Sequence, residues 1–207
     1  AVAGARFPQG RYVRRVLVEG GRAVGVALDG EELRGGTVVV AAGSWSALVE
    51  GGGVPSQAVR PARGQMAAIE MRPSLFRHVL APFRRGYLVP RFDGVALAGS
   101  TLEMVGFRKE VTVSGLAHIL GMAMQVVPAL GDLPVVETWS NFRPYTPDRM
   151  PVLGRTEIEG LVLATGHHRY GILLAPLTAS LVTELVVGAR PSVELAPFAV
   201  DRFGEKV

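Results

Sequence analysis

The sequence predicts a mixed α+β or α/β fold, in which mixed β-sheets are covered by packed helices. Two continuous apolar runs, 37–42 and 161–165, are typical of strands buried on both faces of a sheet. Turn sequences such as Asp29-Gly30 separate further strand-like segments and predict hairpins. Helical periodicity over 113–127 and a long apolar run over 172–187 predict two helices, so helices alternate with strands.

The N-terminal part of the chain reads as β-structure. Strands are expected over 11–18 and 23–28, and the Asp29-Gly30 turn follows them. The buried run 37–42 ends at Gly43, and we expect Ser44 to cap a short helix there. A strand, a glycine turn and a helix N-terminus allow backbone to approach a phosphate or a flat cofactor closely.

The middle of the chain predicts three more strands and one helix. The strands cover 65–71, 86–91 and 95–99, and the helix covers 113–127 after a cap at Thr112 or Ser114. Its expected buried stripe follows helical spacing and consists of Val113, Leu116, Ala117, Leu120, Met124 and Val127.

The C-terminal part predicts a strand over 135–143, a proline-rich break and the buried strand 161–165. A polar loop, 166–171, then leads into a helix over 172–187 that is apolar nearly all round. Such a helix is typical of a protein core.

Composition excludes several classes of protein. The chain has 207 residues, 48% of them hydrophobic and 19% charged, which excludes disorder. The absence of cysteine excludes disulfides, thiol catalysis and cysteine-ligated metals. The net charge is +4, but the arginines are scattered, so no nucleic-acid partner is expected. We expect no metal, no membrane span and a cytoplasmic location.

The loop 166–171 is the first candidate site. It combines two histidines and Arg169 with the N-terminus of a helix, which carries about half a positive charge. The loop can therefore bind an anion or a cofactor, although an ordinary capped turn has the same sequence features.

Arg143 and Tyr87 are the second pair of candidates. Arg143 ends a predicted strand just before a proline, and its planar fork suits a carboxylate. The alternative is a structural ion pair with Asp148 or Glu137. Tyr87 either contacts a ligand or packs with its hydroxyl in water.

Five segments, in order, resemble motifs of one family. Residues 38–46 resemble V-V-x-A-x-G-x-W-S, 86–91 resemble Y-I-V-P-R, and 99–101 resemble G-A-T. Residues 141–154 resemble R-P-x-T-P-D-x-x-P-x-I-G, and 166–176 resemble G-H-x-x-x-G-I-L-L-A-P. The family is the FAD-dependent amino-acid oxidases of the D-amino-acid oxidase and glycine oxidase group. The motifs are most similar to those of glycine oxidases, which implies a role in thiamine biosynthesis.

The resemblance implies a reaction and a set of site residues. A hydride leaves the α-carbon of a neutral amine for the flavin, the imine is hydrolysed, and oxygen is reduced to hydrogen peroxide. Arg143 and Tyr87 would hold the substrate carboxylate, and Arg169 would lie near flavin and substrate. The implied cofactor contacts are Val13, Ala42, Gly43, Trp45, Gly166, His167, His168, Gly171 and Ile172.

The resemblance also implies how the chain is organised. Residues 1–56 and 145–207 would be the C-terminal part of a Rossmann-like FAD-binding domain, and 57–144 a substrate domain with a mixed sheet and helix 113–127. No G-x-G-x-x-G motif occurs in the sequence. We therefore expect an incomplete enzyme that needs an N-terminal FAD-binding half, in cis or in trans, and that holds no FAD alone. The alternative is a truncated, non-catalytic domain or a split subunit. A homo-oligomer is also possible.

Overall fold

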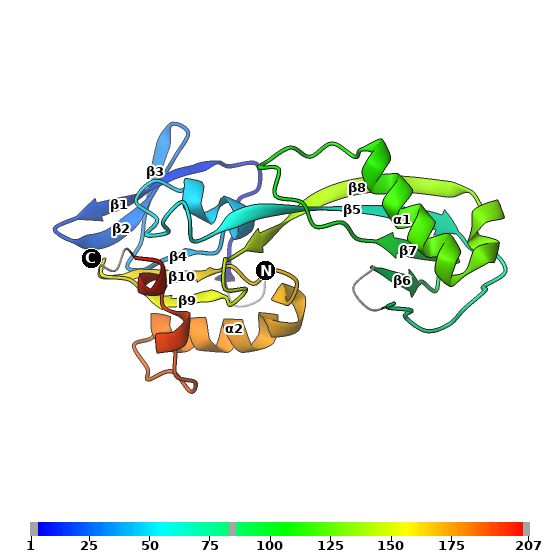
Figure 1. The fold of residues 1–207 in the computed structure, drawn as a ribbon. Helices are drawn as coiled ribbons and strands as arrows, with labels where there is room; N and C mark the ends of the chain where they lie inside the picture. The colour runs from blue at the N-terminus through cyan, green and yellow to red at the C-terminus, as the bar shows by residue number, and fades with distance from the viewer. Residues whose placement is uncertain (1–3, 83–85, 205–207) are drawn as a thin grey trace. The chain divides into compact units, whose positions relative to one another are not determined.

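A computed structural model describes residues 4–82 and 86–204. The chain forms two compact units. Unit 1 consists of Ala1–Arg60 and Pro144–Val207, and unit 2 consists of Pro61–Arg143. Several sheets and few helices make up the molecule, which confirms the predicted mixed α/β class (Figure 1). The assignment of 57–144 to a substrate domain, and of 1–56 and 145–207 to a cofactor domain, stays a prediction.

Unit 1 contains two three-stranded sheets. The first is an antiparallel hairpin sheet in the order β1-β2-β3, made of β1 (Val13–Glu19), β2 (Arg22–Leu28) and β3 (Glu31–Arg34). The second has the order β4-β10-β9, made of β4 (Val38–Val40), β10 (Leu161–Thr165) and β9 (Val152–Arg155). β4 and β10 are parallel, so their carboxyl ends lie at the same edge of the sheet.

Strand β9 was missed by the sequence analysis, which placed a proline-rich break there. It pairs antiparallel with β10, from Val152 opposite Thr165 to Arg155 opposite Val162. Because Pro151 precedes the strand, it removes no hydrogen bond from the ladder. Leu161, Leu163 and Val152 are buried and form the core of unit 1 together with Val40.

The helices of unit 1 differ from the sequence prediction in two ways. The short helix η2 (Gly43–Leu48) has no side-chain cap, and Ser44 lies buried inside it rather than capping it. Helix α2 (Gly171–Val186) buries only Leu181 and Leu185, so the expectation of a core helix was wrong for this chain. The described part of unit 1 also contains the short helices η4 (Ala196–Phe198) and η5 (Val200–Phe203).

Unit 2 is a four-stranded sheet with one helix against it. The strands lie in the order β6-β7-β5-β8 and comprise β5 (Arg60–Glu70), β6 (Tyr87–Pro90), β7 (Val95–Gly99) and β8 (Val135–Tyr145). β7 pairs antiparallel with both β5 and β6. The long strand β5 therefore lies inside the sheet, between β7 and β8.

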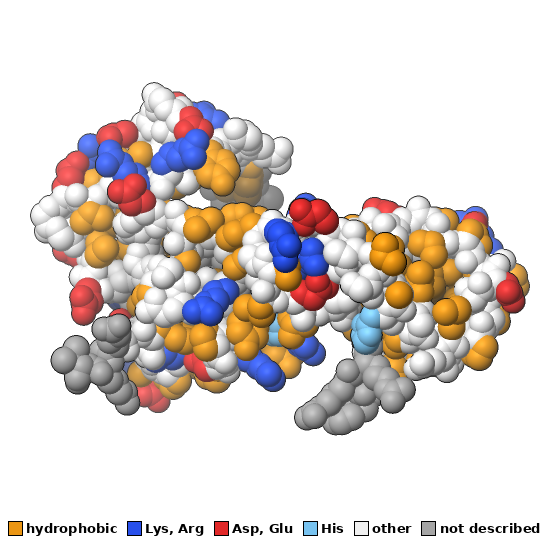
Figure 2. Space-filling view, turned by 45° about the horizontal axis from the view of Figure 1, so that its top comes forward, with side chains coloured by type: hydrophobic (Ala, Val, Ile, Leu, Met, Phe, Trp, Pro, Cys, Tyr) orange, Lys and Arg blue, Asp and Glu red, His pale blue; other side chains and the backbone are white. Residues whose placement is uncertain are grey.

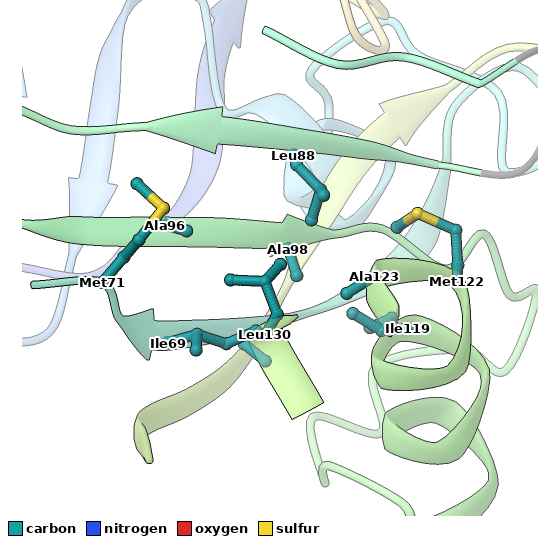
Figure 3. Close-up of a cluster of buried hydrophobic side chains, with 10 residues drawn as sticks. Ile69, Met71, Leu88, Ala96, Ala98, Ile119, Met122, Ala123 and Leu130 are labelled. Carbon is teal, nitrogen blue, oxygen red and sulfur yellow. The ribbon is translucent and has the colours of Figure 1, made fainter. Parts of the chain in front are cut away.

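Helix α1 (Val113–Val126) covers one face of this sheet and is followed by η3 (Pro128–Asp132). The Thr112 hydroxyl caps α1 by accepting a hydrogen bond from the Gly115 amide. Of the two caps that the sequence predicted, Thr112 is therefore confirmed. Figure 3 shows Ile119, Met122 and Ala123 of α1 facing the buried side chains of the strands.

The predicted buried stripe of α1 was right only in part, since Leu116, Leu120 and Val127 pack, partly buried, against the core. Val113 is 87% exposed and Met124 is 45% exposed, whereas Gly115, Ile119 and Ala123 are buried. Both sets have helical spacing, and the hydrophobicity of the helix does not distinguish them. The small residues Gly115 and Ala123 determine the buried face because they let the helix approach the sheet closely.

No helix in the described part of the chain is long and apolar enough to cross a membrane.

Candidate functional site

Strand β5 presents two different faces. Ala67 and Ile69 point into the core beneath α1. Because side chains alternate along a strand, Gly64 and Met66 lie on the opposite face. Arg143 and Tyr87, the predicted substrate residues, contact those two positions. Unit 2 thus brings both candidates to one face of its sheet.

Arg143 lies near the end of β8 with its guanidinium over Gly64. A Cβ atom at Gly64 would lie 2.2 Å from Nη1 of Arg143, so the guanidinium occupies the place of a side chain. Nη1 donates to the carbonyl of Thr101 at 3.2 Å, and Nη2 donates to the hydroxyl of Ser100. A guanidinium has five donors, so these bonds leave others available.

Arg143 makes no ion pair within residues 4–82 and 86–204. Asp148, one proposed partner, binds Arg202 instead, with Nε and Oδ2 2.7 Å apart. Glu137, the other proposed partner, makes no ion pair with Arg143 either. The alternative of a structural bridge is therefore wrong for both carboxylates, and the half-buried guanidinium has no carboxylate partner in the described part of the chain.

Tyr87 begins β6 opposite Gly99 of β7. Its hydroxyl donates to Sδ of Met66 at 3.4 Å, and Met66 is opposite Gly99 on the other side of β7. Gly99 leaves room for this contact, because a Cβ atom there would lie 2.1 Å from Sδ of Met66 and displace the end of that side chain. A thioether is a weak acceptor, so a carboxylate oxygen would replace it readily.

In unit 1, the turns after β4 and β10 are bonded to each other. The Thr165 hydroxyl donates to the carbonyl of Gly43 at 3.0 Å, and the Ser46 hydroxyl donates to Oγ1 of Thr165 at 2.7 Å. Both hydroxyl residues are buried. Gly43 and Gly166 have φ of 53° and 74°, a conformation that favours glycine. The structure thus brings these two predicted cofactor residues together.

The loop 166–171 is fixed by contacts of its two histidines with neighbouring segments. Nε2 of His167 bonds Oγ1 of Thr178 on α2 at 3.0 Å, and burial lowers the pKa of His167, so its ring is neutral near pH 7. His168 is buried, has a φ of 48° and packs edge-on against Tyr145. Arg169 is exposed.

The remaining predicted cofactor residues lie on exposed parts of unit 1. Ile172, in the first turn of α2, is 94% exposed, and Trp45 is 42% exposed. Ala42 precedes η2, and the amide of Trp45 donates to its carbonyl. Val13 lies in the hairpin sheet, opposite Leu28, and belongs to neither of the two turns.

These residues fit a flat, partly apolar group with an electron-rich edge. A Cβ atom at Gly43 would meet nothing within 4 Å, so backbone is accessible there. The first turn of α2 carries no acidic side chain, and its free amide groups favour negative charge. Trp45 and Ile172 add exposed apolar surface.

Sequence analysis missed the residues that support Arg143 and Tyr87. Gly64 and Met66 lie in a predicted strand and its flank, and Thr101 lies in a motif that carried no assigned role. One signal was available, because a glycine inside a strand often marks a close approach by another group.

Charged side chains of both signs are mixed on the face of the molecule seen in Figure 2. Figure 2 shows Lys and Arg interleaved with Asp and Glu on the visible face rather than gathered in one basic patch. Among the described residues, no three His, Asp or Glu side chains are grouped to hold a metal ion.

Comparison with known proteins shows the family to which this chain belongs. The chain belongs to the FAD dependent oxidoreductase family, whose profile matches residues 1–185. This match confirms the family that the five sequence motifs indicated.

Within this family, the chain is similar to glycine oxidases and to a bifunctional ThiO/ThiG protein. The glycine oxidase of Pseudomonas aeruginosa is 39% identical over 190 residues, which cover 90% of this chain and 51% of that protein. The bifunctional protein ThiO/ThiG of Synechocystis sp. is 35% identical over 206 residues, covering 97% of this chain and 30% of that protein. The crystal structure of glycine oxidase from Geobacillus kaustophilus matches with a TM-score of 0.84 and 32% identity, covering 93% of this chain and 52% of that one. The chain therefore spans about half the length of these glycine oxidases.

Proposed function

We propose that this chain is the substrate-binding portion of an FAD-dependent oxidase of small amino acids such as glycine or sarcosine. The net reaction converts the amine, oxygen and water to a carbonyl compound, the released amine or ammonia, and hydrogen peroxide. One observation carries the proposal: the guanidinium of Arg143 is half-buried on the face of a sheet and has no carboxylate partner among the described residues.

Arg143 and Tyr87 would bind the carboxylate of the substrate. The planar guanidinium holds two oxygens at fixed positions, so it orients the α-carbon as well as binding it. The Tyr87 hydroxyl would leave Sδ of Met66 and donate to the carboxylate, which is the stronger acceptor. Arg169 would add positive charge beside the reacting atoms.

Residues of unit 1 would hold the cofactor. FAD, when bound, supplies the redox chemistry by accepting a hydride. We assign its contacts to the bonded turns at Gly43 and Gly166, to His167 and His168, and to the first turn of α2 from Gly171. These groups contribute backbone donors and the helix dipole, which stabilise negative charge. Ala42, Trp45 and Val13 are assigned to the same cofactor.

The chain needs a partner segment to complete this function. Ile172, Leu173 and Leu177 on α2 are exposed apolar residues, and β4 is an edge strand of its sheet. An N-terminal FAD-binding half, in cis or in trans, would cover this surface and supply the pyrophosphate site. A homo-oligomer, a cytoplasmic location and a role in thiamine biosynthesis stay predictions.

The test compares the chain alone with the chain joined to an N-terminal FAD-binding half. We expect no stoichiometric flavin absorbance in the chain alone, and flavin absorbance with peroxide release from glycine or sarcosine in the joined protein. Bound flavin without peroxide from a panel of small amino acids would contradict the proposed substrate class. Stoichiometric flavin in the chain alone would contradict the need for a partner half.

A further inference from the structure

We propose that Arg63-Gly64-Gln65 of β5 is a positioning element that fixes the guanidinium of Arg143 for carboxylate binding. Neighbouring residues of this tripeptide lie on opposite faces of the sheet. Gly64 leaves space for Arg143 on one face of the sheet. On the other face, Arg63 and Gln65 anchor the segment 101–112, which supplies a hydrogen-bond acceptor to Arg143. The inference rests on the proposed role of Arg143 in binding substrate.

Gly64 is required for space and not for backbone conformation. Its φ lies outside the left-handed region, so any residue could adopt this backbone. A Cβ atom there, however, would lie 2.2 Å from Nη1, 2.6 Å from Nη2 and 2.7 Å from Cζ of Arg143. The whole guanidinium therefore packs directly against the backbone of β5, and any side chain at position 64 would displace it.

Gln65 fixes the acceptor of Arg143. Its backbone amide donates to Oγ1 of Thr101 at 2.9 Å, and the carbonyl of Thr101 accepts from Nη1 of Arg143 at 3.2 Å. The Gln65 side chain is fully buried, bonds Oε1 of Glu103 at 2.7 Å, and accepts from the amide of Thr112 at 2.8 Å.

Arg63 anchors the rest of the same segment. It is 4% exposed, pairs with the carboxylate of Glu103, and donates to the carbonyl of Glu110 at 2.9 Å. The segment 101–112 is thus tied to β5 at several points along its length. These hydrogen bonds restrict the movement of the segment, although Nε of Arg63 is buried without a hydrogen-bond partner among the described residues.

Substitution of Gly64 tests the positioning role directly. In Gly64→Ala, the contact at 2.2 Å is with the mobile end of a long side chain, so the guanidinium should move while the strand stays in place. We expect KM for glycine, and the dissociation constant of glycolate measured by the flavin absorbance change, to rise about 10- to 100-fold in the joined enzyme. The melting temperature and flavin content should stay close to those of the parent.

Gly121→Ala is the matched control. A Cβ atom at Gly121 meets nothing within 4 Å, and the residue lies in α1 of the same unit. Alanine favours a helix, so this variant should retain its KM, its glycolate affinity and its fold.

Two double variants separate positioning from a general structural role. Gly64→Ala added to Arg143→Lys should change KM less than about twofold, because the group that Gly64 positions is already lost. If Gly64→Ala alone lowers the melting temperature, Gly64→Ala in an Arg143→Ala background should not lower it further, since the clashing atoms are gone.

The inference is overturned if Gly64→Ala retains the parent KM and glycolate affinity while Arg143→Lys loses both. It is also overturned if the effects of Gly64→Ala and Arg143→Lys add fully, or if truncating Arg143 fails to remove a loss of stability. An Arg143→Lys variant with unchanged KM would instead contradict the proposed function on which the inference rests.

Discussion

Arg202 holds the turn that follows β8 in unit 1. Its guanidinium pairs with Asp148, and it donates to the carbonyls of Met150 and Pro151 at 3.0 Å each. Partial burial acts to raise the pKa of Asp148, but hydrogen bonds from Arg202 and from the Met150 amide outweigh it and hold the pKa below its usual value. The charged form of Asp148 therefore stabilises the fold.

Asp148→Asn should lower the free energy of unfolding at neutral pH by about 1 kcal/mol, a value already reduced for solvent screening of this partly exposed pair. Because the folded-state pKa is lowered, the stabilisation is present above about pH 4, the ordinary Asp value, and is lost as pH falls further. Urea unfolding between pH 3 and pH 7 should show the difference from the parent shrinking toward low pH. A difference that is constant with pH, or as large in the control Asp132→Asn, would contradict this account.

The sequence predicted the residue types of the site better than their partners. Asp148, five residues from Arg143, was a reasonable partner for it, yet Arg202 occupies that carboxylate. No local pattern joins residues 148 and 202, because this pair depends on how the tail packs. The contact of Tyr87 with Met66 likewise depends on strand register, which the sequence did not specify.

At the scale of elements, α2 shows that the burial of an apolar helix residue depends on the tertiary packing around it. Leu173 is 77% exposed and Leu181 is 3% exposed, although both belong to the same apolar helix. Periodicity cannot separate them because the helix is apolar nearly all round. The difference arises from tertiary packing, since the buried residues of α2, Leu181 and Leu185, both lie in its later turns.

Leu181→Ala should therefore lower the free energy of unfolding of the chain by about 2–5 kcal/mol, because it leaves a cavity. Leu173→Ala on the same helix should change it by less than about 0.5 kcal/mol. Urea unfolding of the chain alone measures both. Equal losses in the two variants would mean that the first turns of α2 are also covered in the chain alone.

The elements that the sequence located correctly are those with strong local signals. The hairpin at Asp29-Gly30 and the α1 cap at Thr112 have sequences that favour only a few conformations. Strand β9 was missed because it is four residues long and follows a proline. The buried face of α1 was predicted only in part, because two overlapping sets of its residues have helical spacing.

At the scale of the whole molecule, the sequence motifs predicted more about function than the hydrophobic periodicity did. Composition and pattern alone predicted a mixed α/β chain, which many unrelated functions share. The ordered motifs identified the family, and the profile match over residues 1–185 confirms it. The roles of individual residues stay predictions, because a shared fold does not determine what a particular side chain binds.

The central claim is that Arg143 binds the carboxylate of an amino-acid substrate, and one variant tests it most directly. Arg143→Lys keeps the charge but loses the planar fork. In the chain joined to an FAD-binding half, we expect KM for glycine or sarcosine to rise about 10- to 100-fold, since a charged hydrogen bond is lost, with flavin content and melting temperature unchanged. The control is Arg91→Lys, because Arg91 is half-exposed and pairs with Asp93. A parental KM in Arg143→Lys, with or without a lower melting temperature, would contradict the claim.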